Sequence, residues 1–99
     1  MTFQPLGTIN ASPPTNALVG TTPSVVVAEN INRVGLILTN LSTGTIYIGI
    51  GNTSTLNAGI VITKDGGNWN MDRHTFSNQG ISAVGHGANL IISIQEFIR

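Results

Sequence analysis

Thirteen isoleucines and seven valines stand in short runs along this 99-residue sequence, mostly separated by Gly, Asn, Ser and Thr. Both side chains are stiff at χ1 and suit the pleated surface of a β-strand. In three segments apolar residues alternate with other residues at a period of two: 34–38, 46–50 and 90–94. That period is typical of a strand with one buried face, whereas no segment shows the 3.6-residue period of an amphipathic helix. The sequence therefore predicts an all-β protein.

Weaker patterns add four further strands and bring the expected total to about seven. These segments are residues 23–29, 59–63, 67–72 and 80–85. The connections LSTG, KDGG and HGA are too short for a parallel crossover, which needs a dozen or more residues. In KDGG, Asp65 and Gly66 suit the positive φ angles of a type I′ hairpin. The predicted fold is a small antiparallel β-sandwich or jelly roll.

Residues 1–22 differ from the remainder, since they hold three of the four prolines and lack a persistent period. We predict an extended N-terminal arm here and a sandwich domain at residues 23–99. A disordered terminus is the alternative for such a segment. Several isolated apolar residues suit an arm that lies along a groove or pairs with a neighbour's sheet edge. They are Phe3, Leu6, Ile9, Leu18 and Val19.

Charged residues make up only 8% of the chain, four basic and four acidic, so the formal net charge is zero. An average soluble domain has about 25%. Because the basic residues are few and scattered, the sequence argues against binding to nucleic acid or to an anionic membrane. There is no cysteine, which excludes disulfides and thiolate metal sites. The N-terminus MTFQPLGTIN lacks a basic region followed by an apolar run, so we expect no signal peptide and synthesis in the cytoplasm.

The stretch TIYIGIGNTS resembles the glycine-rich turn of a phosphate site, but it lacks the required context. The position of the third glycine of a dinucleotide fingerprint is Ser54, and no helix is expected after it. Lys64 stands between Thr63 and Asp65, not in a P-loop ending. We therefore interpret Gly49 and Gly51 as positions of close packing or a bulge at a strand end.

Other catalytic and metal-binding patterns are equally weak. His74 and His86 are the only histidines, and a metal site would need further ligands brought in by folding. The carboxylates are expected in turns or at strand ends, where they face water, and no Gly-x-Ser-x-Gly elbow is present. They are Glu29, Asp65, Asp72 and Glu96. We predict a protein that is not an enzyme and has no cofactor.

The aromatic residues offer a different hypothesis. Trp69 and Met71 alternate as an inward-facing pair would, which favours core packing of the indole. Tyr47 lies on the opposite side of its strand from the isoleucines and is predicted to be exposed, as an interface residue. Either ring could also stack on a sugar, with neighbouring asparagines binding hydroxyl groups, so a carbohydrate-binding module is the alternative from another functional class.

One order of motifs is similar to small β-structured virion proteins of tailed bacteriophages. It runs Asn30, Asn32-Arg33-x-Gly35-Leu36-Ile37, Asn40-x-Ser42, Ile46-Tyr47-Ile48-Gly49-x-Gly51, a strand led by Gly59, a glycine turn, GISAVG and a closing strand. The resemblance covers roughly residues 24–97. It implies a non-enzymatic structural protein of a capsid, neck, fibre or tail, often a symmetric oligomer. It brings no functional residues, and the arm lies outside it.

These observations predict a virion protein that decorates or cements the phage head, with a neck, fibre or tail protein as the alternative. Its partners would be the major capsid protein or other virion proteins. Sheet edges are usually blunted by Lys or Pro, and both are scarce after residue 23, so we expect subunits to cover them in a closed homotrimer. The residues expected at capsid or subunit contacts are Phe3, Pro5, Leu6, Ile9, Tyr47, Phe97, Ile98 and Arg99.

Overall fold

A computed structural model describes residues 9–72 and 74–99, and within these ranges the chain forms nine β-strands. The strands are β1 (Asn10–Ala11), β2 (Thr15–Val19), β3 (Ser24–Val27), β4 (Arg33–Asn40), β5 (Ile46–Ile50), β6 (Ile60–Ile62), β7 (Asn68–Asn70), β8 (Ile81–Gly85) and β9 (Leu90–Ile98). The described residues include no helix long and apolar enough to cross a membrane. The prediction of an all-β protein is confirmed.

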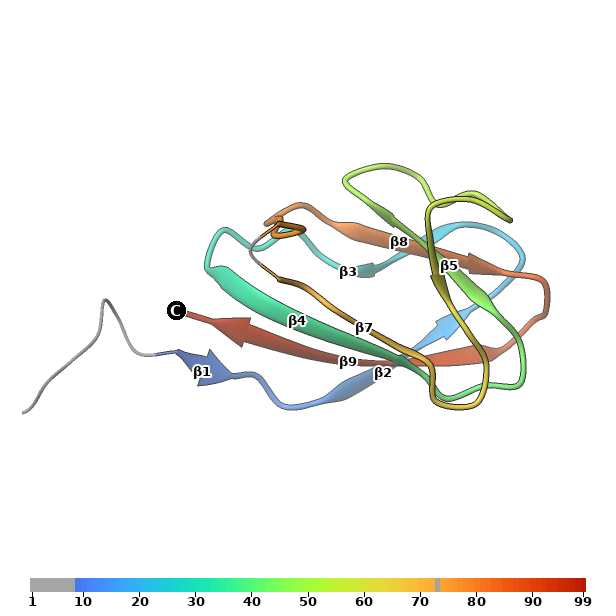
Figure 1. Cartoon of the computed structure of the whole chain (residues 1–99), viewed down its shortest axis with the longest axis horizontal. Coiled ribbons are helices and arrows are strands. Elements are labelled where there is room, and N and C mark those ends of the chain that lie inside the picture. The colour runs from blue at the N-terminus through green and yellow to red at the C-terminus, as the bar shows by residue number, and fades with distance from the viewer. Residues whose placement is uncertain (1–8, 73) are drawn as a thin grey trace, which may run out of the picture.

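Two antiparallel sheets pack face to face (Figure 1). Sheet A has the order β2-β9-β4-β7, with the short β1 also paired to β9, and sheet B has the order β3-β8-β5-β6. Four of the ladders pair β2 with β9, β3 with β8, β4 with β7 and β5 with β6. The chain is thus one long antiparallel ribbon that turns back between β5 and β6 and is rolled into two layers. This winding is a jelly roll, as the sequence predicts.

A strand forms at each of the seven segments predicted for the sandwich, and β4 and β9 extend beyond the predicted bounds. The three alternating segments lie in β4, β5 and β9, and the four weaker ones contain β3, β6, β7 and β8. The additional strands, β1 and β2, come from the range assigned to the arm. Their presence raises the count above the expected seven.

Residues 10–19 are extended, but they belong to the sandwich and not to a separate arm. Thr15 to Val19 pair in register with Ile94 to Leu90, and Val19 is fully buried in the core. The nine-residue β9 provides a long edge, so this segment pairs with its own sheet and not with that of a neighbour. Only Ala17 and Val19 alternate inward, which is too short a pattern to stand out in the sequence. Phe3, Pro5 and Leu6 lie outside the described residues.

The short turns do not join strands that pair with each other. LSTG, KDGG and HGA each connect a strand of one sheet to a strand of the other. Asp65 and Gly66 do have the predicted positive φ angles, 59° and 98°. The hairpin prediction is nevertheless wrong, because their amides donate to the carbonyls of Ser42 and Asn40 at 2.9 and 2.7 Å and so fix the turn against the β4–β5 connection. Turn length and turn chemistry do not specify which sheet the next strand joins.

The core lies between the two sheets and is built from aliphatic side chains on alternate strand positions. Its completely or almost completely buried members are Val19, Leu36, Leu38, Ile46, Ile48, Ile62, Ile81, Ala83 and Ile92. Trp69 and Met71 pack against this cluster, which confirms the predicted inward pair. The apolar residues that define the strand period are therefore the same residues that hold the layers together.

Asn40 fastens one end of the sandwich from inside. Its side chain is fully buried, and its amide nitrogen donates to the carbonyls of Gly44 at 2.7 Å and Ile62 at 3.0 Å. Its amide oxygen accepts from the backbone N–H and the hydroxyl of Ser42, at 2.9 and 2.6 Å. One side chain therefore joins β4, the following turn and β6, which gives the Asn-x-Ser motif a structural role.

Candidate assembly surfaces

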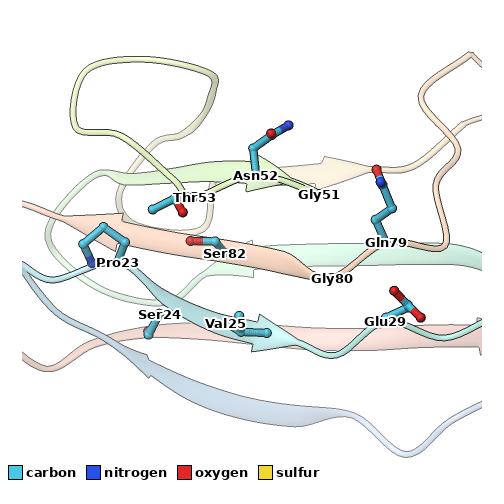
Figure 2. Close-up of a pocket in the computed structure, with 10 residues that line it drawn as sticks. All are labelled: Pro23, Ser24, Val25, Glu29, Gly51, Asn52, Thr53, Gln79, Gly80 and Ser82. Carbon is cyan, nitrogen blue, oxygen red and sulfur yellow. The ribbon is translucent and has the colours of Figure 1, made fainter.

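An open groove of about 570 Å³ lies on the outer side of sheet B (Figure 2). It is lined by Pro23, Ser24, Val25, Glu29, Gly51, Asn52, Thr53, Gln79, Gly80 and Ser82. The Gly51 amide donates to the Gly80 carbonyl at 2.8 Å, and φ of Gly51 is +69°. A Cβ on Gly49 would lie 2.7 Å from the Asn52 carbonyl oxygen. The prediction that these glycines permit close packing at a strand end is confirmed.

The side chains around this groove offer little chemistry. Glu29 is the one charged side chain among the ten lining residues, and none of the ten is aromatic or a histidine. The Ser82 hydroxyl accepts from the Ser54 amide at 3.0 Å and bonds to the Ser54 hydroxyl at 2.7 Å. Within the described ranges, no three His, Cys, Asp or Glu residues gather as metal ligands. The groove has neither a general base beside a nucleophile nor an aromatic platform for a sugar.

The predicted exposure of Tyr47 is wrong, because its side chain is only 9% exposed. Its hydroxyl donates to the Asn57 side-chain oxygen at 3.0 Å, and its ring meets the His86 imidazole edge-on, with centroids 5.6 Å apart. Asn57 lies in the β5–β6 loop, which folds back over the outer side of sheet B. A period-two pattern cannot show that a loop covers the polar side of a strand. Tyr47 is therefore buried, and Trp69 is partly buried against the core.

One end of the sandwich brings together the β3–β4 loop, residues 71–72 and 74–79, the last residues of β9 and the start of β1; we call it the terminal end (Figure 1). Arg33 organises it from a position that is 1% exposed. Its Nε donates to Glu96 Oε2 at 2.6 Å. The guanidinium also donates to the carbonyls of Ala28, Ser77 and Gln79, at 2.6 to 3.0 Å. The loops at this end are thus fixed by a buried cation.

Exposed apolar side chains gather on the terminal end. Ile31 is 86% exposed in the β3–β4 loop, Phe76 is 44% exposed and Ile9 is 56% exposed. The Asn78 side chain holds the two loops together, since its nitrogen donates to the carbonyls of Asn30 and Arg33 at 3.0 Å. Several exposed apolar side chains at one end of a fold make that end a candidate interaction site. The terminal end is therefore the first candidate for a subunit contact.

Several of the predicted contact residues are also found at this end. Asn10 pairs with Ile98, which places Ile9 beside the end of β9, and the Arg99 amide donates to the Asn32 carbonyl at 2.9 Å. Phe97 faces outward from the same strand end. Ile31 and Phe76 were not predicted, because single apolar residues in polar loops carry no periodic signal.

The turn that presents Phe76 is held by Asp72. Its Oδ1 accepts from the His74 amide at 2.8 Å, and from the amide and hydroxyl of Thr75 at 3.0 and 3.1 Å. These bonds favour the carboxylate and hold the pKa of Asp72 below its ordinary value of 3.8, the His74 amide contributing most. A group with a lowered pKa stabilises the fold above its unfolded-state pKa and loses that contribution as the pH falls through the folded-state value.

We therefore expect acid to loosen this turn before the sandwich unfolds. As the pH falls from 5 to below 3.8, the amide resonances of His74 and Thr75 should shift and exchange faster, while those of β4 and β9 remain in place. A nitrogen–proton NMR titration measures both sets. Asp72→Asn should remove the pH dependence of the turn, and an unchanged titration in that variant would contradict the assignment.

Comparison with known proteins gives a fold but no family. No known family profile matches the chain, and no curated protein matches it. A solved structure from Bacillus endospore appendages, described as a novel family of disulfide-linked pili, superposes with a TM-score of 0.53 at 18% identity. The superposition covers 100% of this chain and 98% of that chain, so the likeness extends over the whole domain.

Proposed function

We propose that this protein is a non-enzymatic structural subunit that assembles with other copies of itself, using the terminal end as a contact. The observation that carries the proposal is the exposure of Ile31, Phe76 and Ile9 on an end that is rigidly held from inside by Arg33. A rigid apolar surface can be buried by a second subunit at little cost in conformational entropy.

The composition supports this proposal. Because only 8% of residues are charged, a subunit contact can bury large areas without burying charged side chains that lack a partner. The structural neighbour is itself a pilus protein, which is consistent with a subunit role for this jelly roll. That neighbour is described as disulfide-linked, whereas this chain has no cysteine. Contacts between copies of this chain would therefore form without disulfides.

Two kinds of assembly fit a subunit of this kind. The resemblance of the motif order to phage virion proteins favours a decoration or cement protein that binds a phage head, with a neck, fibre or tail position as the variant. The neighbour favours a filament. The two differ in symmetry, because a closed oligomer such as the predicted homotrimer stops growing, while a head-to-tail contact that does not close extends into a fibre. Electron microscopy of the concentrated protein distinguishes closed particles from filaments.

The contact is tested by removing its apolar groups. In the double variant Ile31→Ser, Phe76→Ser, we expect self-association to weaken by at least about tenfold, since burying one such side chain contributes about 1.5–3 kcal/mol. Sedimentation velocity over a concentration series measures this change. Both side chains are exposed, so the variant should keep the fold and its circular dichroism spectrum.

Val61→Ser is the matched control, because Val61 is 52% exposed but lies on β6 in sheet B. It should associate like the parent protein. Equal association of the double variant and the parent would exclude the terminal end as the contact.

A further inference from the structure

A row of exposed apolar side chains lies on the outer face of sheet A, at the end of the sheet where β2 leads into the β2–β3 connection. Leu18 of β2 pairs directly with Ile91 of β9, and Leu41, just after β4, donates its amide to the Ile91 carbonyl at 3.0 Å. The three side chains are 65%, 37% and 54% exposed. They alternate with the buried Val19, Ile92 and Asn40, so all three point away from the core.

The middle of this face is polar. Two residues further along the strands, the register aligns Asn16, Ser93, Thr39 and Asn68. The following row aligns Gln95, Ile37 and Asn70. Apart from Ile37, each side chain carries a hydroxyl or an amide, and each amide can both donate and accept a hydrogen bond.

The far end of the face is apolar again. Phe97 aligns with Ala11 of β1 on one side and with Gly35 of β4 on the other. A Cβ on Gly35 would lie 3.4 Å from the Phe97 ring, an ordinary contact distance, so the ring lies close to this strand. Along β9 the face therefore reads apolar, polar, polar and apolar.

None of the chain's charged side chains among the described residues lies in these four rows. Glu96 faces inward to the buried Arg33, and the remaining charges of the described strands and loops lie in connections or at the C-terminus. The centres of protein interfaces are likewise depleted in charge. An exposed sheet face without charge is unusual in a monomer, whose solvent-facing strand positions ordinarily carry charged residues.

We propose that the outer face of sheet A binds the same face of a second copy of this chain, across a two-fold axis; the proposal rests on the self-assembly proposed above. The face is its own complement. A two-fold axis in the interface, at right angles to the strands, sets the Ile91 row of one copy against the Phe97 row of the other. The two polar rows of one copy then face the two polar rows of the other. Their amides and hydroxyls can form hydrogen bonds, and no charged side chain is buried without a partner.

Charge placed on this face tests the proposal. Two-fold symmetry makes Ile91→Lys bring two ammonium groups into one interface, so we expect the dissociation constant to rise at least about 100-fold. Val25→Lys is the control, since Val25 is 69% exposed on the outer side of sheet B. Sedimentation velocity compares the two at matched concentration, and circular dichroism verifies that both fold. Parent-like association of Ile91→Lys would overturn the proposal.

A single introduced thiol tests the symmetry directly, because the chain has no cysteine. Ser93 and Thr39 lie at the centre of the face, near the proposed axis. Packed sheets stand about 10 Å apart, too far for a disulfide but within reach of a short bismaleimide. Ser93→Cys and Thr39→Cys should each crosslink to a covalent dimer in high yield at dilution, whereas Val25→Cys should not. Yields equal to that of Val25→Cys would contradict the two-fold contact.

The experiments give different results depending on which of the two proposed contacts exists. If the terminal end is a contact and sheet A is not, the Ile31→Ser, Phe76→Ser variant loses association while Ser93→Cys gives no dimer. If sheet A is the contact and the terminal end is not, Ser93→Cys crosslinks fully in that same double variant. A parent protein that is monomeric at every concentration refutes both.

Discussion

Replacing Arg33 by alanine is expected to destabilise the fold by about 3–5 kcal/mol, the usual cost of breaking a buried ion pair from one side. The substitution leaves Glu96 without its cation and three backbone carbonyls without their donor. Arg33→Lys should recover only part of the loss, because an ammonium group cannot span partners in the β3–β4 loop, in residues 77–79 and on β9. The positive charge of lysine therefore does not replace the hydrogen bonds of the planar guanidinium group.

Equilibrium unfolding in urea, followed by Trp69 fluorescence, measures the free energy of unfolding of each variant. Arg99→Ala serves as the control, since the Arg99 side chain is exposed, and it should lie within about 0.5 kcal/mol of the parent. Arg33→Ala within about 1 kcal/mol of the parent would contradict the structural role assigned to this guanidinium.

The second large effect is expected at Asn40, where alanine should cost about 2–4 kcal/mol. The substitution removes all four side-chain hydrogen bonds and leaves the buried carbonyl of Ile62 without its side-chain donor. It also creates a small cavity beside the core. Because Asn40 joins β4 to β6, the loss should appear as faster hydrogen exchange in both strands.

Ser42→Ala distinguishes the contribution of the buried Asn40 side chain to stability from that of the turn that follows β4. That variant loses the hydroxyl contacts to Asn40 and Gly44 but keeps the Ser42 amide bond to Asn40, so the expected cost is about 1 kcal/mol or less. Unfolding midpoints of the two variants provide the measurement. A larger cost for Ser42→Ala than for Asn40→Ala would place the structural role in the turn and not in the buried amide.

The β-sandwich could be predicted because the residues that form its core are the same residues that recur with a period of two in the sequence. Leu36 and Leu38, or Ile46 and Ile48, recur at every second position since one face of each strand is buried. The pairing of β2 with β9 could not be predicted in this way. Five residues with two inward side chains give almost no periodic signal, and a partner more than 70 residues further along the chain is not specified locally.

The burial of polar and aromatic residues was also beyond the reach of sequence patterns. Arg33 is one of four scattered basic residues in the sequence, but its three carbonyl partners and Glu96 come together only through the rolled topology. Tyr47 occupies the polar side of β5 and is buried because the β5–β6 loop returns over it. The Asn-Arg-x-Gly-Leu and Asn-x-Ser motifs thereby have structural roles, because Arg33 and Asn40 hold the two ends of the sandwich together and Gly35 pairs with Phe97.

The molar mass of the 99-residue chain in solution, measured by light scattering from low to high micromolar concentration, tests self-assembly most directly. The monomer has a mass of 10.3 kDa. A subunit that assembles through its terminal end and the outer face of sheet A should give a molar mass above that of the monomer, which rises with concentration and is lowered by Ile31→Ser, Phe76→Ser or by Ile91→Lys. A mass of 10.3 kDa at every concentration would contradict the proposed self-assembly.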